Sequence, residues 1–459
     1  MQGIESVGVQ KIEGPIVILE KNGPVKFDEV VNIYDRNRNV QTGKVLAVSE
    51  TSVVVQVFGS TTGLSIKNTN VEFLDTPMRI PVSKEMLGRI FDGLGNPYDK
   101  LPQVFSSDYR DVNGASINPY IREYPRDFIQ TGVSAIDGLT TLIRGQKLPI
   151  FSGNGLPHNA LAAQIVRQAK LKTSDEPFTI VFAAMGVKHD VAQYFISNFE
   201  KSGVLSNVVL FLSLADAPSV ERLITPRAAL TAAEYLAFDC DMHVLVILTD
   251  MTNYCEALRE VATARGEIPS RKGYPGYLYS DLAAIYERAG RIRGKKGSIT
   301  QIPILSMPND DITHPIPDLT GYITEGQIVL DRELSQKNIY PPIAGLPSLS
   351  RLMKDGIGPK MTRDDHKDVA SQLFACYSKV KEIRALASVI GEEELSELDK
   401  IYLNFGVELE NKFLSQRQDE NRSIEETLDI GWRLFKILPE EELYRIDRKL
   451  IDKYLPKEK

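Results

Sequence analysis

Apolar and polar residues alternate in three different ways along this chain of 459 residues. In the first 75 residues, short apolar or β-branched runs are separated by turn residues, as at 16–19 and 44–58. The second of these runs is interrupted by polar residues 49–52, which predicts a β-hairpin. Strands at this spacing, with turns between them, indicate a small closed β-barrel over residues 1–75.

Residues 76–360 follow a second pattern, in which short apolar runs alternate with segments long enough to be helices. Two of these helix-length segments are residues 161–171 and 219–238. Apolar strands that alternate with helices predict an α/β domain, with a mostly parallel sheet covered by helices on both faces. The predicted strands are residues 147–151, 178–184, 208–214, 244–249 and 302–306.

The third pattern covers residues 361–459, where the strand signal fades and apolar residues recur every three or four positions. A further helical stretch is expected to begin at residues 431–435. The chain therefore predicts a C-terminal helical bundle. One face of an amphipathic helix is predicted from the spacing of Leu395, Leu398, Tyr402, Phe405, Leu409 and Phe413.

Composition and charge exclude several classes of protein. Hydrophobic residues make up 42% and charged residues 25% of the chain, which is ordinary for a globular protein. The net charge of −7 argues against nucleic acid or anionic lipid as a partner. No apolar stretch of ~18 residues is present, so no insertion into a membrane is expected.

The N-terminus and the cysteines predict a reduced, cytosolic compartment. The first residues lack the basic and then apolar pattern of a signal peptide. The three cysteines Cys240, Cys255 and Cys376 cannot all pair, and none belongs to a Cys-x-x-Cys motif. Cys240 and His243 have the spacing of two metal ligands, but no second pair completes a zinc site, so we expect no metal held by this chain.

A glycine-rich segment stands where strand 147–151 meets the following helix, which is the place of a phosphate-binding loop. Such a loop reads G-x-x-x-x-G-K-[ST], because its N–H groups and lysine hold the phosphates and its hydroxyl holds Mg²⁺. With Gly153 as the first glycine, His158 replaces the second glycine, Asn159 the lysine and Ala160 the hydroxyl. This P-loop-like segment therefore lacks the residues that the chemistry requires.

Two interpretations of the segment stay open. It is either a strand-to-helix turn that never bound phosphate or a degenerate nucleotide site. Pro157 has no N–H, so one donor of the cradle is missing. Gly153, Asn154 and Gly155 could still donate N–H groups, so weak nucleotide binding is a hypothesis, whereas tight binding of a magnesium nucleotide by this chain alone is not expected.

A second element of the same chemistry is the apolar run 243–249, which ends in Asp250. A buried parallel strand that ends in an acid is typical of the place where nucleotide-hydrolysing proteins hold Mg²⁺. Strands often end in Asp before a turn, so this pattern gains weight only from its place after the loop. We include Asp250, with His158 and Asn159, in the candidate degenerate nucleotide site.

Taken together, several segments closely resemble the non-catalytic B subunit of the A-type and V-type rotary ATPases. The resemblance extends over essentially the whole chain, and the motifs are jointly very specific. The segments that carry it are residues 128–137, 144–152, 245–254, 273–279, 290–294, 347–352 and 453–456.

The resemblance implies a subunit made of a barrel, a nucleotide-binding α/β domain and a helical bundle. It implies three such subunits alternating with three catalytic A subunits around a central stalk, with a peripheral stalk, on the cytoplasmic face of the membrane. In that family the A subunit carries the intact phosphate loop, and ATP or ADP with Mg²⁺ binds at the interface between the two. The complex couples ATP synthesis or hydrolysis to ion transport, of H⁺ or Na⁺.

The resemblance also implies roles for single residues. Arg351 follows Pro347-Ser348-Leu349-Ser350 at the position of the family's arginine finger, which acts on the γ-phosphate held by the neighbouring A subunit. Val187 stands where catalytic relatives have the Glu that orients the attacking water. One position departs from the pattern, because Ala344 stands where the family commonly has an acid or amide.

Three other functions are weighed against this one. A self-sufficient P-loop enzyme needs the lysine and hydroxyl that Asn159 and Ala160 replace. A purely structural ring subunit would leave Arg351 without a role. A nucleotide-sensing subunit would use the remaining N–H donors of the loop. A change in turnover without a change in assembly on mutation of Arg351 discriminates the finger from the structural subunit, and calorimetry of nucleotide binding tests the sensing role.

Overall fold

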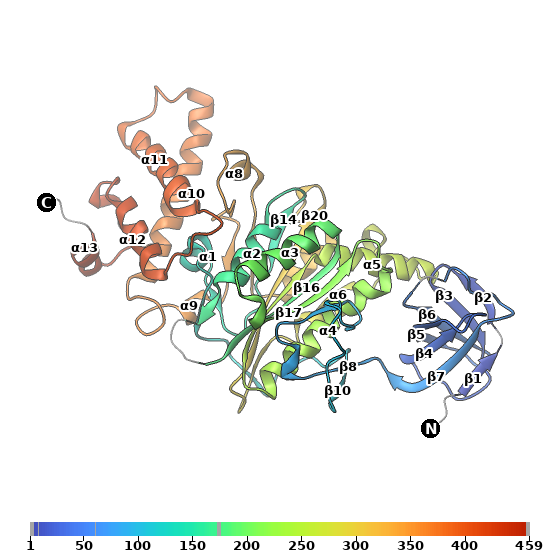
Figure 1. Cartoon of the computed structure of the whole chain (residues 1–459). Coiled ribbons are helices and arrows are strands. Elements are labelled where there is room, and N and C mark those ends of the chain that lie inside the picture. Colours follow the sequence, from blue (N-terminus) through green and yellow to red (C-terminus); the bar gives the residue numbers. More distant parts are fainter. Residues whose placement is uncertain (1–3, 8, 60, 172–175, 456–459) are drawn as a thin grey trace.

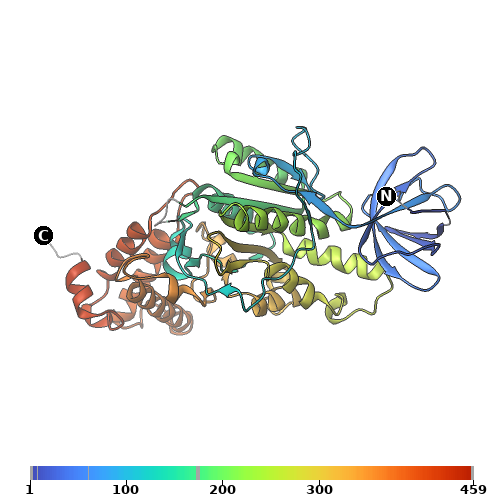
Figure 2. The same cartoon turned by 90° about the horizontal axis from the view of Figure 1, so that it is seen from below.

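The protein is elongated and consists of three parts in chain order (Figure 1). A computed structural model describes residues 4–7, 9–59, 61–171 and 176–455. The β-barrel and the N-terminus lie at one end, the α/β domain is in the middle, and the helices of the C-terminal part lie at the other end, as the view in Figure 2 also shows. The predicted fold class is therefore confirmed.

The barrel is a single antiparallel sheet with the strand order β1-β7-β4-β5-β6-β3-β2. The predicted hairpin is confirmed, since β5 and β6 pair across a turn in which Ser49 N donates to Ser52 O at 2.8 Å. Alternate residues of β6 (Val53, Val55 and Val57) point into the barrel core. The strands are β1 (Ile4–Val7), β2 (Val9–Glu13), β3 (Ile16–Glu20), β4 (Glu29–Tyr34), β5 (Val40–Val48), β6 (Ser52–Val57) and β7 (Asn70–Pro77).

The centre of the molecule is a sheet with the order β22-β21-β14-β20-β18-β16-β17-β9. All neighbouring pairs in this row are parallel except β21 and β22. Because its strands are buried on both faces, they are apolar at nearly every position. The strands of the row are β9 (Ile90–Asp92), β14 (Ile150–Gly153), β16 (Phe178–Val187), β17 (Val208–Leu214), β18 (His243–Thr249), β20 (Ser298–Met307), β21 (Gly326–Val329) and β22 (Leu349–Ser350).

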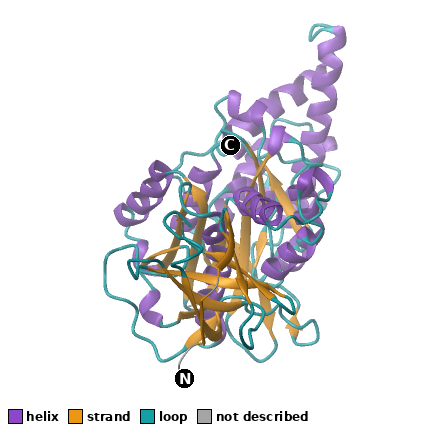
Figure 3. Ribbon diagram, turned by 90° about the vertical axis from the view of Figure 1, so that its right-hand side faces the viewer, coloured by secondary structure: helices purple, strands orange, loops and turns teal. Residues whose placement is uncertain are grey.

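Helices cover both faces of this sheet. Val181 and Ala183 of β16 belong to one core with α4 and α5, whereas Phe182 and Ala184 belong to the other core with α2 and α3. Figure 3 shows the strands in the barrel and the centre, and a C-terminal part made of helices. The helices of the α/β domain are α1 (Ser134–Leu139), α2 (His158–Gln168), α3 (His189–Lys201), α4 (Ser219–Phe238), α5 (Met251–Ala264), α6 (Leu278–Tyr286), α7 (Pro315–Ile323), α8 (Arg332–Gln336) and α9 (Met353–Gly356).

Short strands complete the α/β domain. β12 pairs with both β13 and β15, and β19 joins β11 to the main sheet. None of the helices in the described part of the chain is both long and apolar enough to cross a lipid bilayer. The short strands are β8 (Arg79–Pro81), β10 (Tyr109–Asp111), β11 (Arg122–Glu123), β12 (Phe128–Gln130), β13 (Leu142–Ile143), β15 (Lys170–Leu171) and β19 (Gly290–Ile292).

The C-terminal part contains α10 (His366–Ile390), α11 (Glu397–Glu408), α12 (Ile424–Phe435) and α13 (Arg448–Tyr454). A π-helix over Leu409–Leu414 continues α11 directly. The predicted apolar face of this segment is confirmed, because its six residues pack into or against one core. That core also contains residues of α2 and α3, so the helical part and the α/β domain share a continuous apolar interior.

Three predicted element boundaries are wrong. The strand predicted over residues 147–151 is β14, which begins only at Ile150. Lys147 forms only an isolated bridge, and its ammonium group pairs with Glu287 and Glu325, each at 2.8 Å. Helix α2 covers His158–Gln168 and not residues 161–171, because Lys170–Leu171 pairs with β12 as a strand. Residues 431–435 end α12 and do not begin it.

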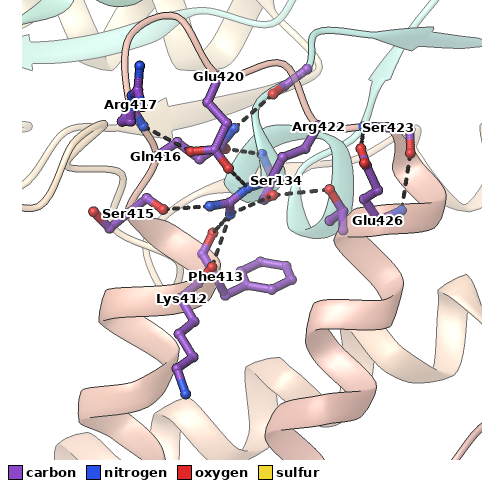
Figure 4. Close-up of polar contacts among 12 residues, drawn as sticks. Ser134, Lys412, Phe413, Ser415, Gln416, Arg417, Glu420, Arg422, Ser423 and Glu426 are labelled. Carbon is purple, nitrogen blue, oxygen red and sulfur yellow. Dashed lines mark hydrogen bonds and ion pairs between the residues drawn. The ribbon is translucent and has the colours of Figure 1, made fainter.

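The C-terminal part is held to α1 by the guanidinium group of Arg422 (Figure 4). This group donates to the carbonyl oxygens of Lys412, Phe413 and Ser415 at 2.9–3.1 Å and to Ser134 Oγ at 3.2 Å. It therefore satisfies the carbonyl groups that the end of the π-helix leaves without intrahelical partners. The Arg422 side chain is only 12% exposed, and it also pairs with Glu420 at 2.5 Å.

Replacing Arg422 with Ala is expected to destabilise the C-terminal part by about 2–3 kcal/mol, because buried carbonyl groups lose a charged donor. Trp432 is the chain's single tryptophan and lies in α12, so its fluorescence during urea unfolding reports on this part. Arg417→Ala is the matched control, since Arg417 lies nearby but its side chain is 80% exposed. Its effect is expected to stay within about 0.5 kcal/mol, and equal effects of the two variants would contradict the assignment.

Candidate functional site

The candidate site lies at the edge of the sheet where the parallel strands end. β14 ends at Gly153, β18 ends before Asp250, and β16 ends at Val187. Polar groups gather at such an edge because the strands themselves are apolar and the loops that follow them start there. The parallel pairing therefore brings together the two elements that the sequence analysis placed in one site.

The glycine-rich loop forms the turn between β14 and α2, as expected. Pro157 stands at the N-cap of α2 and makes no side-chain cap. His158 opens the helix, and its ring nitrogen Nδ1 lies 3.0 Å from Ser152 Oγ. Asn159 and Ala160 follow in the first turn, so no ammonium group or hydroxyl stands where a magnesium nucleotide needs them. The donor set of this loop does not fit Mg²⁺ and a triphosphate.

The face of the loop is also occupied by an ion pair that the sequence analysis missed. Arg332 donates to both carboxylate oxygens of Asp310, at 2.7 and 2.9 Å, and to the carbonyl oxygen of Asn154 at 3.0 Å. Asp310 lies so close to Gly153 that a Cβ added to that glycine would be 2.1 Å from its Oδ1. The hydrogen bond from Arg332 lowers the pKa of Asp310, so a carboxylate charge faces the loop. The face of the loop is thus filled by a carboxylate and its own arginine partner.

No local pattern in the sequence predicts this contact. Arg332 is 178 residues from Asn154 along the chain, and neither partner belongs to a recognisable motif. The contact arises because β14, β20 and β21 are neighbours in the sheet, so that the segments following β20 and β21 reach the same edge.

Asp250 is the N-cap of α5 and is almost fully buried. Its Oδ1 accepts hydrogen bonds from Thr252 N at 2.8 Å and from Ser306 N at 3.1 Å. This carboxylate therefore binds the start of α5 to the end of β20, which is a structural role at the position of a metal-binding acid. In the described part of the chain, no three His, Cys, Asp or Glu side chains are grouped as a metal site.

Asp250 also acts on His158 through its charge. Burial lowers the pKa of His158, and the nearby charge of Asp250 opposes this shift without overcoming it. The imidazole is thus neutral near pH 7. A neutral ring contributes no positive charge to a bound phosphate, in contrast to the lysine of a working loop.

Arg351 lies at another edge of the sheet, directly after the edge strand β22. Its backbone N–H donates to Glu325 O at 2.9 Å, and Nη1 donates to Thr324 O at 3.3 Å. Ser350 is buried and fixes the strand, because its Oγ donates to Thr141 O and accepts from Gln146. The backbone before the guanidinium group is therefore rigidly held.

Arg351 lines a surface pocket of about 350 Å³. Among the described residues it forms no ion pair with any carboxylate, although Asp318 lines the same pocket and pairs with Arg271. Among the described residues no hydrogen bond or ion pair joins it to the glycine-rich loop, so the structure does not bring Arg351 and the loop residues into one site. An exposed arginine on a fixed strand can bind an anion from outside the chain.

The loop before Arg351 has Ala344 where the family commonly has an acid or amide, and other groups supply its hydrogen bonds. The Ala344 N–H donates to Val329 O at 2.9 Å, and the Ala344 carbonyl accepts from Ser348 Oγ at 2.6 Å. Ser348 Oγ in turn accepts from Val329 N at 2.9 Å. Ser348 therefore provides the hydrogen bonding that orients this loop.

Comparison with known proteins relates this geometry to a family. The family description "ATP synthase alpha/beta family, nucleotide-binding domain" matches residues 132–350. The beta-barrel domain of that family matches residues 9–75, and the "C-terminal domain of V and A type ATP synthase" matches residues 355–455.

Relatives extend over nearly the whole chain. The V-type ATP synthase beta chain 2 of Treponema pallidum is 65% identical over 455 residues, which cover 99% of this chain and 95% of that protein. The B subunit of the A-type ATP synthase from Aeropyrum pernix is 60% identical over 449 residues, or 98% of this chain and 97% of that protein. The chain belongs to the B subunit family of V-type and A-type ATP synthases.

A solved ATP synthase subunit from Nanoarcheaum equitans shares the fold of this chain. The TM-score is 0.73 at 43% identity, with 92% of this chain and 98% of that chain covered. The resemblance stated from the sequence motifs is thereby confirmed. The roles of the single site residues are not tested by these likenesses and stay predictions.

The lowered pKa of His158 makes a prediction about stability. The unfolded chain takes up a proton on this histidine as the pH falls through about 6.5, whereas the folded chain does so only at a lower pH. The stability contributed by neutral His158 is therefore complete above pH 6.5 and is lost progressively below it. In His158→Gln, the midpoint of thermal unfolding is expected to fall less on acidification than in the wild type.

Circular dichroism on either side of pH 6.5 measures this effect. His189→Gln is the matched control, because His189 lies at the start of α3 with its side chain 69% exposed. The assignment of His158 as a half-buried neutral group is wrong if both variants show the same acid sensitivity as the wild type.

Proposed function

We propose that this chain does not hydrolyse ATP itself and that it completes the catalytic site of a neighbouring A subunit with Arg351. The guanidinium group would bind the γ-phosphate of a nucleotide held by that neighbour. Phosphoryl transfer depends on positioning and on charge stabilisation, so one added planar cation changes the rate strongly. The observation that carries the proposal is the exposed guanidinium group of Arg351 on a fixed edge strand, without an ion pair among the described residues.

The state of this chain's own loop supports the division of labour. Asn159 and Ala160 offer neither the cation nor the hydroxyl of a working loop, and the ion pair of Asp310 and Arg332 occupies its face. Val187 ends β16 as an apolar side chain and can neither accept a proton nor orient water. A chain with these groups needs a partner to supply the phosphate-binding loop and the catalytic carboxylate.

Membership of the family supports a proposal about the partners. We propose an alternating ring with the catalytic A subunit, contacts with central and peripheral stalks, and a peripheral position on the cytoplasmic face of a membrane. ATP or ADP with Mg²⁺ would bind at the A–B interface and couple to ion transport. No nucleotide would be bound tightly by this chain alone, although Gly153, Asn154 and Gly155 still provide N–H groups of a degenerate site.

Replacing Arg351 with Ala is expected to lower ATP turnover of the reconstituted ring by ~10³-fold or more, the range known for such fingers. The ring is expected to assemble normally, because no carboxylate in the described chain loses an ion pair when Arg351 is removed. Steady-state ATPase assays measure the first effect, and native mass spectrometry measures the second.

Arg351→Lys and Arg36→Ala serve as controls for this experiment. Lysine keeps the charge but loses the planar fork, so a partial loss of turnover is expected. Arg36 lies exposed in the turn between β4 and β5 of the barrel, and its replacement is expected to leave turnover unchanged. An intact ring with full activity in Arg351→Ala would favour the alternative, a structural or nucleotide-sensing subunit.

A further inference from the structure

The edge strand that precedes Arg351 is very short. β22 contains only Leu349 and Ser350, which pair with Gln327 and Gly326 of β21. A ladder of two residue pairs gives few backbone hydrogen bonds, and an edge strand has a neighbouring strand on one side only. Further contacts are therefore needed to fix this strand and the arginine that follows it.

Gln146 provides these contacts. Its side chain is completely buried, and Nε2 donates to Ser350 Oγ at 2.9 Å and to Glu325 O at 3.2 Å. Oε1 accepts from Ile143 N at 3.0 Å, so both ends of the amide are hydrogen-bonded. Glu325 O also accepts from the backbone N–H of Arg351, at 2.9 Å. One amide group thus holds the residue before Arg351 and the carbonyl group to which Arg351 donates.

Gln146 is itself fixed to the interior of the main sheet. Its carbonyl oxygen accepts from a backbone N–H of β20 at 2.9 Å. The next residue, Lys147, is almost fully buried, and its Nζ and its backbone N–H each lie 2.8 Å from a carboxylate oxygen of Glu325. Residues 146 and 147 therefore connect Glu325 to the centre of the sheet, independently of the edge strand.

We propose that Gln146 is a positioning residue for the guanidinium group of Arg351. This inference rests on the proposed function, in which that group acts on a phosphate held by the neighbouring subunit. Nη1 of Arg351 donates to Thr324 O at 3.3 Å, so its guanidinium group and its backbone both contact residues 324–325, where Gln146 donates. A cation stabilises a transition state only from the correct place, and a displacement of about 1 Å can lower turnover ~10²-fold.

Replacing Gln146 with Met in the reconstituted ring removes these hydrogen bonds and keeps a side chain of similar shape. We expect kcat for ATP hydrolysis to fall about 10- to 100-fold, because the guanidinium group loses its fixed place. KM is expected to stay within about twofold, since the neighbouring subunit holds the nucleotide and the finger acts in the transition state. Steady-state assays measure both constants, and native mass spectrometry checks that the ring is intact.

Gln301→Met is the matched control. Gln301 is fully buried in β20, and neither of its amide atoms has a hydrogen-bond partner among the described residues. Its backbone N–H, which donates to Gln146 O, is unchanged in the variant. Turnover of this variant is therefore expected to stay at the wild-type level.

The Arg351→Ala background separates positioning from a structural role. A residue that acts through Arg351 has no further effect once the guanidinium group is absent, so Gln146→Met is expected to leave the residual turnover of Arg351→Ala unchanged. A general distortion of the sheet would lower turnover by the same factor in both backgrounds. Radiolabelled ATP and long incubations measure this residual turnover.

Full turnover in Gln146→Met would overturn the inference, and so would an equal loss in both backgrounds. Should Gln146→Met fail to assemble, Ser350→Ala decides in its place, with an expected fall in kcat of about fivefold from the loss of one hydrogen bond and the same dependence on Arg351. Normal turnover in Arg351→Ala removes the proposed function and this inference with it, and that result is read from Arg351→Ala alone. A loss of kcat in Gln146→Met that is absent from Gln301→Met and from the Arg351→Ala background supports the inference.

Discussion

The parallel sheet buried on both faces is the constraint on which the rest of this structure depends. Helices cover both of its faces, and because the side chains on both faces are buried, they are apolar. Polar chemistry is thereby confined to the ends of the strands. The loop after β14, the acid after β18 and the turn after β16 meet at one edge for this reason, whether or not they retain a catalytic function.

The same edge stays ordered although it has lost its phosphate chemistry. Where a nucleotide would bring negative charge and Mg²⁺ into the loop, this chain brings its own ion pair of Asp310 and Arg332. Asp250 likewise caps α5 and binds the end of β20. These contacts replace a ligand by internal partners, so the fold of the edge does not require nucleotide. Arg351 lies exposed at a different edge, after β22.

Sequence reasoning predicted most of the fold because long apolar runs are unambiguous. It predicted the residues of α4 and the hairpin of β5 and β6, and the motifs identified the family. It failed at boundaries decided by distant contacts or by short caps. The start of α12 was missed although Ser423 and Glu426 form a capping box, because the apolar residues around Trp432 dominated the pattern. In the candidate site, the loop and Asp250 were predicted from motifs, whereas Asp310 and Arg332 carry no local signal and meet the loop only through the strand order.

The helix after the degenerate loop is fixed from its other end. Gln164 and Gln168 of α2 donate to the carbonyl oxygen of Glu420 at 3.1 and 3.0 Å, and Arg167 donates to Gln418 O at 2.7 Å. The segment that accepts these bonds is the one that Arg422 anchors to α1. Helix α2 is therefore joined to the C-terminal part by these hydrogen bonds and by a shared apolar core. In this chain the C-terminal part therefore fixes the position of α2.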